Sequence, residues 1–187
     1  MVLIFFMKNT LNKILPIISS SIICNENIIV VNHKNLLFVL NVLKKHLNTR
    51  YTLLTSISGV DLLTSNYRFS VVYDLLSFTF NSRLRVKIFI DELTHVDSVM
   101  SIFRNADWWE REVWDLFGIY FQKHSDLRRI LTDYGFEGFP LRKDFPLSGY
   151  VEVRYDQAKK RIVVEPLELA QEFRSFKYET PWNNYKI

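Results

Sequence analysis

The chain has 187 residues, of which 48% are hydrophobic and 24% charged, and its formal net charge is +4. This length predicts one domain, or one domain with a long appendage. Cys24 is the one cysteine, so the chain forms no internal disulfide, and alone it lacks the thiolates that an iron–sulfur cluster needs.

The distribution of charge argues against nucleic-acid binding. Residues 1–100 carry ten Lys and Arg against six Asp and Glu, whereas residues 101–187 carry fourteen of each. A nucleic-acid-binding protein usually concentrates its basic excess on the recognition element. Here the distinctive second half is neutral. The chain is also rich in Asn, Ile, Lys, Phe and Tyr and poor in Ala and Gly, a bias that suggests an AT-rich genome such as that of an organelle.

The N-terminal segment begins with an apolar run of six residues, Val2–Met7. A bilayer span needs about 20 apolar residues, and the segment has neither a small-residue cleavage site nor an Arg- and Ser-rich transit pattern. We therefore expect no transmembrane segment, so that any membrane association is indirect. Residues 3–19 predict one helix that bends or ends near Pro16.

The segments that follow predict an α+β domain. Residues 34–48 place leucines at spacings of three and four, which indicates an amphipathic helix. Four short runs rich in β-branched or alternating apolar residues predict strands: 27–31, 51–57, 68–76 and 83–90. Asn81-Ser82 fits a hairpin turn between the last two strands. We expect a compact domain over residues 1–104, with helices on one face of an antiparallel or mixed sheet.

Residues 105–187 predict a helix followed by an extended, turn-rich C-terminal appendage. The helix is expected at 107–116, with Asp107 as its N-cap, Glu110 completing a capping box and Gly118 ending it. Glycine and proline then concentrate up to residue 149, which indicates short pieces joined by turns. A final hairpin is predicted from the alternation in residues 150–155 and 161–164.

The acidic residues of the predicted helix admit a catalytic reading and a structural one. Glu110 and Glu112 could act as acid and base in a hydrolase, and Asp115 shares a face with Glu112. Because Arg111 lies between the glutamates, capping and local ion pairing are favoured. The charged run Arg142-Lys143-Asp144 is likewise interpreted as surface or interface charge.

Other candidate sites are weaker. His124 has no second histidine at ligand spacing, so a structural role is favoured over metal binding. The GFEGF run at 135–139 lacks the context of a phosphate loop and predicts a turn. The tryptophans at 108, 109 and 114 are interpreted as core or interface anchors rather than as a platform for stacking RNA bases.

Residues 110–131, EREVWDLFGIYFQKHSDLRRIL, closely resemble the signature of the 30-kilodalton subunit family of respiratory complex I, the NADH:ubiquinone oxidoreductase. The continuation LTDYGFEGFPLRKDFPLSGYVEVRYD also matches, and ISGVDLL and SRLRVKIFI fit the first half of the family. Two positions depart from the pattern. This chain has His124-Ser125 where the family often has His-Pro, and Phe139 where it often has His before Pro140.

The resemblance implies a structural, non-redox subunit of the quinone module, in the peripheral arm on the matrix side of the mitochondrial inner membrane. Such a subunit packs against the 49-kilodalton subunit and has no catalytic centre. It binds no cofactor; FMN and iron–sulfur clusters are expected in neighbouring subunits of the proton-translocating enzyme. The equivalent subunit of a related membrane-bound hydrogenase-type complex is the alternative. The partner interface is then expected to include Trp108, Trp109, Glu110, Arg111, Glu112, Asp115, His124, Arg128, Arg142, Lys143 and Asp144.

Overall fold

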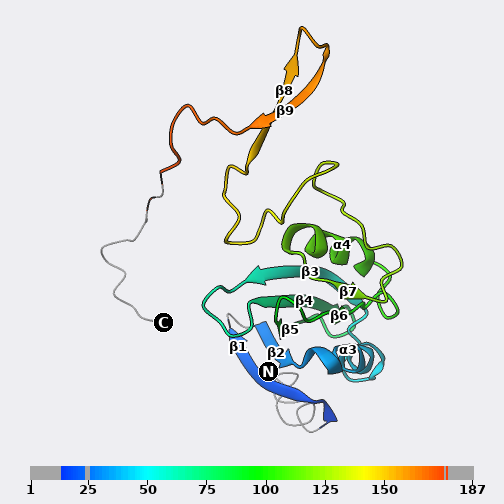
Figure 1. Ribbon diagram of the computed structural model, residues 1–187. Helices are drawn as coiled ribbons and strands as arrows, with labels where there is room; N and C mark the ends of the chain where they lie inside the picture. The colour runs from blue at the N-terminus through cyan, green and yellow to red at the C-terminus, as the bar shows by residue number, and fades with distance from the viewer. Residues whose placement is uncertain (1–13, 24–25, 175, 177–187) are drawn as a thin grey trace. The chain divides into compact units, whose positions relative to one another are not determined.

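The computed structural model describes residues 14–23, 26–174 and 176 and divides the chain into two compact units, Met1–Phe145 and Pro146–Ile187. The first unit has a five-stranded sheet with the order β1-β2-β5-β4-β3 (Figure 1). Its strands are β1 (Ile17–Ile23), β2 (Glu26–Val31), β3 (Leu53–Asp61), β4 (Phe69–Ser77) and β5 (Ser82–Ile90). The α+β prediction is confirmed. In the described part of the chain no helix has the length and apolar character needed to cross a bilayer.

The sheet is mixed because β2 pairs in parallel with β5, while β1–β2, β5–β4 and β4–β3 are antiparallel. The predicted strands within 27–90 are confirmed, and β3 is longer than expected. The predicted N-terminal helix is wrong for residues 17–19, which belong to β1, and residues 3–13 lie outside the described residues. Pairing of Ile17–Ile23 with β2 overrides the local helical pattern.

One face of the sheet is covered by α3 (Leu36–Lys45), which follows the 3-10 turn η2 (His33–Asn35). Leu36, Val39, Leu40 and Leu43 are fully buried in the core, at the spacing of one helical face. The helix ends before Leu47, which is 70% exposed, so the predicted helix is too long at its C-terminus. In β5 the alternate residues from Leu84 to Ile90 are buried, as their pattern predicts.

The helix α4 (Ala106–Phe117) packs against β3 and belongs to the first unit. The boundary between the units therefore falls after Phe145 rather than after residue 104. Gly118 ends the helix in the left-handed conformation, with a φ of 74°, as expected. The capping-box prediction is wrong. The N-cap is Asn105, without a side-chain cap, and the Glu110 carboxylate is bonded elsewhere.

The short strand β6 (Val96–Asp97) precedes α4 in the sequence, and β7 (Phe121–Gln122) follows it. The two strands pair in parallel. After β7 the chain runs through turns back along the helix, where the Leu141 N–H donates to the Leu116 carbonyl at 3.1 Å. The expectation of short pieces joined by turns is confirmed for the remainder of the first unit. This returning segment, residues 123–145, is called the return loop below.

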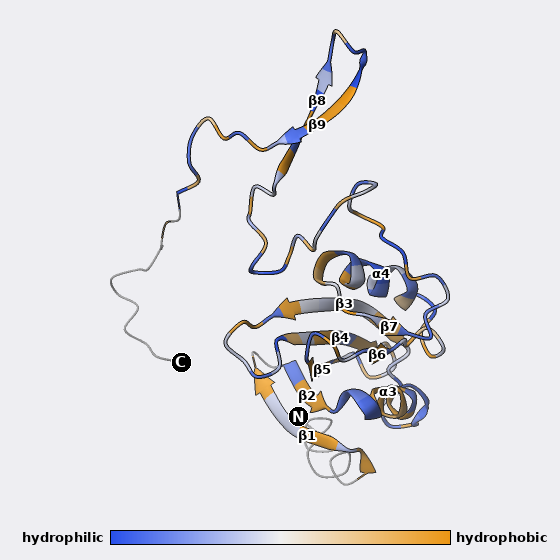
Figure 2. Ribbon diagram, viewed as in Figure 1, coloured by the Kyte–Doolittle hydropathy of each residue, from blue (hydrophilic) through white to orange (hydrophobic). Residues whose placement is uncertain are grey.

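The second unit contains the expected hairpin, formed by β8 (Val151–Asp156) and β9 (Arg161–Pro166). The pairs Val153–Val164 and Tyr155–Ile162 lie on the same face of the hairpin, and all four side chains are exposed. Charged residues dominate the other face, where Arg154 donates to both carboxylate oxygens of Glu165. The hydropathy colouring shows the apolar residues along its strands (Figure 2).

Candidate partner interface

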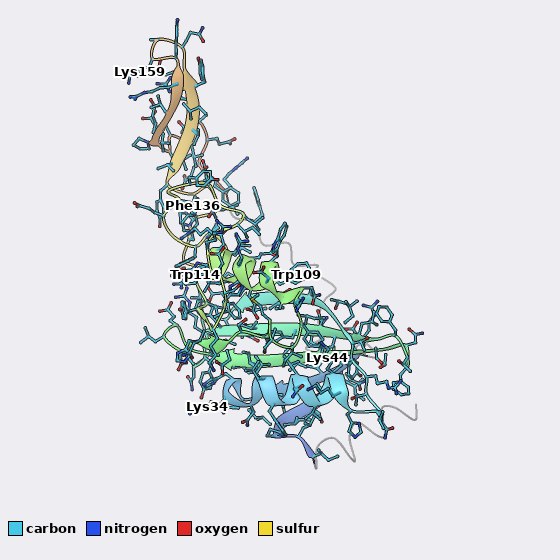
Figure 3. All side chains as sticks on the ribbon, turned by 90° about the vertical axis from the view of Figure 1, so that its right-hand side faces the viewer. Lys34, Lys44, Trp109, Trp114, Phe136 and Lys159 are labelled. Carbon is cyan, nitrogen blue, oxygen red and sulfur yellow. The ribbon has the colours of Figure 1, made fainter. Side chains whose placement is uncertain are left out.

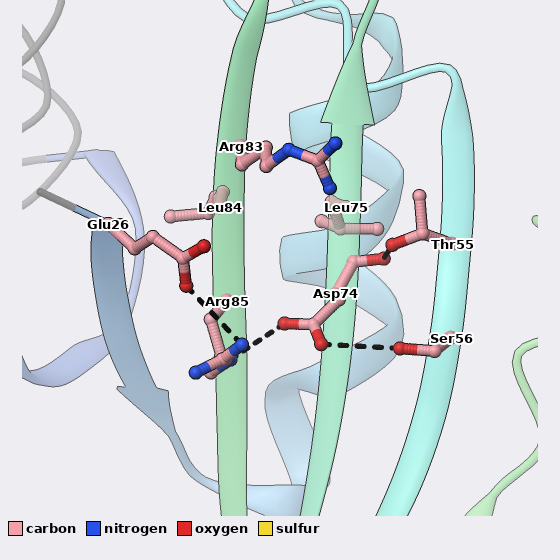
Figure 4. A pocket seen from close by; sticks show the side chains of 8 residues that line it. All are labelled: Glu26, Thr55, Ser56, Asp74, Leu75, Arg83, Leu84 and Arg85. Atoms are coloured by element: carbon pink, nitrogen blue, oxygen red, sulfur yellow. Dashed lines mark hydrogen bonds and ion pairs between the residues drawn. The ribbon is translucent and has the colours of Figure 1, made fainter. Parts of the chain in front are cut away.

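The polar hollow on the sheet face opposite α3 has a volume of about 230 Å³ and lies over β3, β4 and β5 (Figure 4). Arg85 pairs there with Asp74 at 2.7 Å and with Glu26 at 3.3 Å, and Ser56 donates to Asp74 at 3.2 Å. The opposite charges compensate one another, and the Ser56 hydroxyl faces a carboxylate without a histidine base. This arrangement stabilises the sheet and offers no activated nucleophile.

Glu110 of α4 is fully buried beneath the helix. Its carboxylate accepts hydrogen bonds from the Ser98 hydroxyl at 2.6 Å and from the Val99 N–H at 2.7 Å. Burial raises the pKa of Glu110 to about 7, against the lowering effect of these two hydrogen bonds. Glu110 therefore fixes α4 to the segment that follows β6 instead of facing solvent.

His124 lies beside Glu110, and its side chain is also fully buried. Its Nδ1 accepts from the Asp126 N–H at 3.1 Å, so Nε2 carries the hydrogen and faces the Asp107 carbonyl oxygen at 3.2 Å.

The Tyr73 hydroxyl is buried without a hydrogen-bond partner among the described residues. Burial and the nearby Glu110 raise the pKa of Tyr73. In the described part of the chain, no group of three or more His, Cys, Asp or Glu residues is arranged to hold a metal ion.

Asp115, also buried on α4, anchors the return loop. Its carboxylate accepts from the backbone N–H groups of Ile130, Leu131 and Thr132 at 2.8–3.2 Å and from the Thr132 hydroxyl at 2.6 Å. Arg129 donates to the same carboxylate at 3.2 Å. Burial would raise the pKa of Asp115, but these hydrogen bonds lower it below the usual value.

A second anchor joins the end of the return loop to the sheet. Asp61 of β3 binds Arg68 through both carboxylate oxygens and accepts the Lys143 N–H at 2.8 Å. Arg68 also pairs with Asp144 at 3.0 Å. The Arg142 guanidinium donates to the Phe117 carbonyl at 2.6 Å. These contacts connect β3 to a part of the chain that follows much later in the sequence, and they hold the loop close to α4.

The exposed part of α4 forms one wall of an apolar pocket of about 170 Å³. Its lining residues are Trp108, Trp109, Glu112, Ile130 and Leu131. The Trp108 side chain is 69% exposed, whereas Trp109 packs partly against the core. Trp109 and Trp114 are labelled on α4 in Figure 3.

The eleven residues predicted for the interface thus fall into three groups. The side chains of Glu110, Asp115 and His124 are buried within this chain. Arg111, Arg142 and Asp144 are engaged by the chain itself, and Lys143 contributes its backbone N–H. Trp108 and Arg128 are exposed, and Glu112 and Trp109 are partly exposed. These four residues, together with the exposed Lys143 and Asp144, have surface that a partner could cover.

Three important residues were absent from the sequence-based site. Asp61 and Arg68 lie at the two ends of the β3–β4 connection, and Arg129, rather than Arg128, binds Asp115. Phe139, at a position that departs from the family pattern, lies between two arginines. Its ring centroid is 5.1 Å from the Arg129 guanidinium carbon and 4.5 Å from that of Arg142. Asp61 lies beyond the strand predicted at 51–57, and no local sequence pattern marked its pairing with Arg68.

The fold and the anchored loop define an α+β protein in which buried charged groups hold the return loop against α4 and the sheet. Residues 29–151 match the family described as the respiratory-chain NADH dehydrogenase 30 Kd subunit, and the chain belongs to this family. It is 57% identical over 157 residues to NADH-ubiquinone oxidoreductase subunit 9 of Reclinomonas americana, covering 84% of this chain and 77% of that protein.

A relative from Arabidopsis thaliana, named NADH dehydrogenase (ubiquinone) iron-sulfur protein 3, is 61% identical over 140 residues. The match covers 75% of this chain and 74% of the relative. Among solved structures, the membrane-bound sulfane sulfur reductase, an archaeal respiratory membrane complex, contains a similar chain with a TM-score of 0.65. That match is 23% identical and covers 85% of this chain and 98% of the other, and it shows the fold alone.

Proposed function

We propose that this chain is a structural, non-redox subunit of the proton-pumping NADH:ubiquinone oxidoreductase. It supports electron transfer from NADH to ubiquinone by packing against the 49-kilodalton subunit in the quinone module of the peripheral arm. Membership of the family described above and the names of relatives at 57–61% identity support this role. The compositional bias toward AT-rich codons supports a place at the mitochondrial inner membrane, on the matrix side.

The observation that carries a packing role is the uncovered apolar face of the β8–β9 hairpin. Val153, Tyr155, Ile162 and Val164 are each between 58% and 67% exposed. A two-stranded hairpin is at best marginally stable in water, and exposed apolar patches commonly mark interaction sites. Cover from a partner protein would bury this face and stabilise the hairpin. The 49-kilodalton subunit is the partner that we propose.

The proposal that the chain has no catalytic centre is supported by the position of its most perturbed acid. Glu110 has a pKa raised to about 7, which in a cleft would suit a general acid or base. Its side chain is fully buried and already accepts two hydrogen bonds. A substrate therefore has no access to it. FMN and iron–sulfur clusters then belong to neighbouring subunits, and this chain supplies shape and contacts.

The equivalent subunit of a membrane-bound hydrogenase-type complex is the second candidate. The similarity to a chain of an archaeal respiratory membrane complex is compatible with it, but that similarity concerns the fold alone. The curated relatives at 57–61% identity are named as NADH and ubiquinone enzymes. The higher sequence identity to these relatives favours the NADH:ubiquinone enzyme.

A native gel of solubilised membranes tests the proposal. It is probed for this chain and stained for NADH dehydrogenase activity. We expect the chain in the active high-mass band, and cross-linking within that band should join it to the proposed partner subunit. The double variant Val153→Asp/Val164→Asp should leave the band, whereas Arg154→Gln, on the charged face of the hairpin, should remain. A chain that migrates only as a small free species would refute the proposal.

A further inference from the structure

We propose that the pocket between α4 and the return loop receives one cationic side chain, an arginine or a lysine, from a neighbouring protein subunit. The pocket is lined by Trp108, Trp109, Glu112, Ile130 and Leu131. This inference rests on the proposed function, since it requires the chain to be part of a multi-subunit complex. It adds the chemistry of the contact.

The loop side of the pocket is fixed in place. Ile130 and Leu131 donate their backbone N–H groups to the buried Asp115 carboxylate at 3.2 and 2.8 Å. Arg111 reaches from α4 to the carbonyl of Arg128 at 3.1 Å and to that of Arg129 at 3.4 Å. Two sets of polar contacts within the chain, one to Asp115 and one from Arg111, thus hold the loop wall of the pocket. A preformed wall lowers the entropy cost of binding a partner side chain.

The walls of the pocket are apolar and aromatic, and its volume of about 170 Å³ suits a single side chain. Leu131 is 62% exposed and Trp108 69% exposed, so both retain surface that a partner could cover. The residues that contribute most binding energy at protein interfaces are enriched in tryptophan. They lie in pockets from which water is excluded. The aromatic faces also attract a cation, most strongly when the ring is tryptophan.

Glu112 determines which kind of side chain fits. It lies three and four residues after the two tryptophans, so all three side chains share one helix face. Glu112 is partly buried, and its carboxylate forms no hydrogen bond or ion pair with any described residue. A carboxylate at the edge of an apolar pocket is stabilised by an opposite charge. An arginine or lysine would pack its stem against the indoles and place its charged head near this carboxylate.

Two cations close to the pocket residues in the sequence are already engaged. Arg111 is bound to the two loop carbonyls, and Arg128 pairs with Asp126 at 3.0 Å. Nucleic-acid phosphates would be repelled by Glu112, and a lipid tail or quinone ring would gain nothing from a carboxylate. A basic side chain of another subunit satisfies the aromatic and the acidic part of the lining together.

Site-directed cross-linking in the assembled complex identifies the occupant. A photo-reactive phenylalanine analogue is placed at position 131, which leaves both tryptophans and Glu112 in place. We expect a cross-link to a peptide of another subunit in which a lysine or arginine adjoins the linked residue. Linkage to lipid or quinone, to a second copy of this chain, or to a peptide without a basic residue would overturn the proposal.

Salt stability measures the contribution of each side chain. The isolated complex is washed with increasing NaCl, and release of this subunit is followed for Trp108→Ala and Glu112→Gln. Release should be about tenfold faster for Trp108→Ala and roughly fivefold faster for Glu112→Gln. Phe78→Ala and Glu137→Gln are the matched controls. Phe78 is an aromatic residue that is 68% exposed, and Glu137 is an exposed acid of the return loop.

The outcomes separate this inference from the proposed function. If wild-type chain is found in the complex and both pocket variants behave as their controls do, the cation pocket is refuted and the structural role stands. If only Trp108→Ala accelerates release, the occupant is apolar and the proposal of a cation is wrong. Absence of the wild-type chain from the complex overturns both.

Discussion

The ring of Phe117 lies directly against Gly59, so that a Cβ atom added to this glycine would stand 2.6 Å from the Phe117 Cδ2 atom. The glycine lies in β3 and the phenylalanine in the last turn of α4. The absence of a side chain at one position of the strand therefore sets how closely the helix approaches the sheet.

Gly59→Ala should lower the stability of the first unit by about 1–3 kcal/mol, because the ring must shift within a packed interior. The measurement is the midpoint of thermal unfolding. Ser58→Ala, at the exposed neighbouring position of the strand, should change the free energy of unfolding by less than about 0.5 kcal/mol. Equal midpoints for the two variants would contradict the close approach.

Asp115→Ala should release the return loop. The substitution leaves three backbone N–H groups and one guanidinium N–H of Arg129 without their acceptor. The free energy of unfolding should fall by about 3–5 kcal/mol. Limited proteolysis at neutral pH should cut the variant between residues 123 and 145 while the wild type resists. Glu137→Ala, which removes an exposed carboxylate of the same loop, serves as the control and should leave the digestion pattern unchanged.

The same carboxylate predicts a response to acid. Hydrogen bonds lower the pKa of Asp115 in the folded chain, against the raising effect of burial. A lowered folded pKa contributes stability that is present above the unfolded pKa and is lost as the pH falls through the folded value. The loop of the wild type should therefore become protease-sensitive under acid. Asp115→Asn should be sensitive at neutral pH already.

Glu110 should have the opposite dependence on pH. Burial raises its pKa from 4.5 to about 7, so the folded chain binds the proton more tightly than the unfolded chain does. This contribution to stability is present below about pH 4.5 and is lost as the pH rises to 7, by on the order of 3 kcal/mol. Urea unfolding at pH 5 and pH 8 measures it. Glu110→Gln, which keeps an acceptor for Ser98, should reduce the difference between these two pH values.

Arg142→Ala should reduce assembly of the respiratory complex more than turnover per assembled complex. The guanidinium binds the Phe117 carbonyl and pairs with Glu92 at 3.4 Å, so its loss frees the end of the return loop. Arg104→Ala is the matched control, because this arginine is exposed and lies outside the predicted partner interface. Normal assembly with abolished turnover would indicate a catalytic role and contradict the prediction.

Local patterns predicted those elements whose residues alternate or repeat with a clear period. The alternation in β5 and the leucine spacing of α3 placed both elements on the core, and Gly118 marked the end of α4. β1 was missed because its strand character depends on pairing with β2. The parallel pairing of β2 with β5 joins segments between which α3, β3 and β4 intervene in the sequence, and no local pattern encodes it.

The site was less predictable because its charges are satisfied across long sequence separations. The spacing of Asp107 and Glu110 is that of a capping box, yet the Glu110 carboxylate binds Ser98 and Val99 from the segment before the helix. Asp115 resembles a surface acid of an amphipathic helix, but the return loop covers it. Side chains of this kind are identified as buried only when the loop that encloses them is seen.

The amphipathic β8–β9 hairpin also exposes the newly made protein to self-association before it assembles. Its two strands pair only with each other among the described residues, so each has an edge with unpaired backbone groups beside an apolar face. Such a ribbon is a template for pairing with further copies of itself. Newly made chains that wait for their partner are therefore exposed to self-association, and the supply of partner subunits during synthesis would limit how much of this protein reaches its complex.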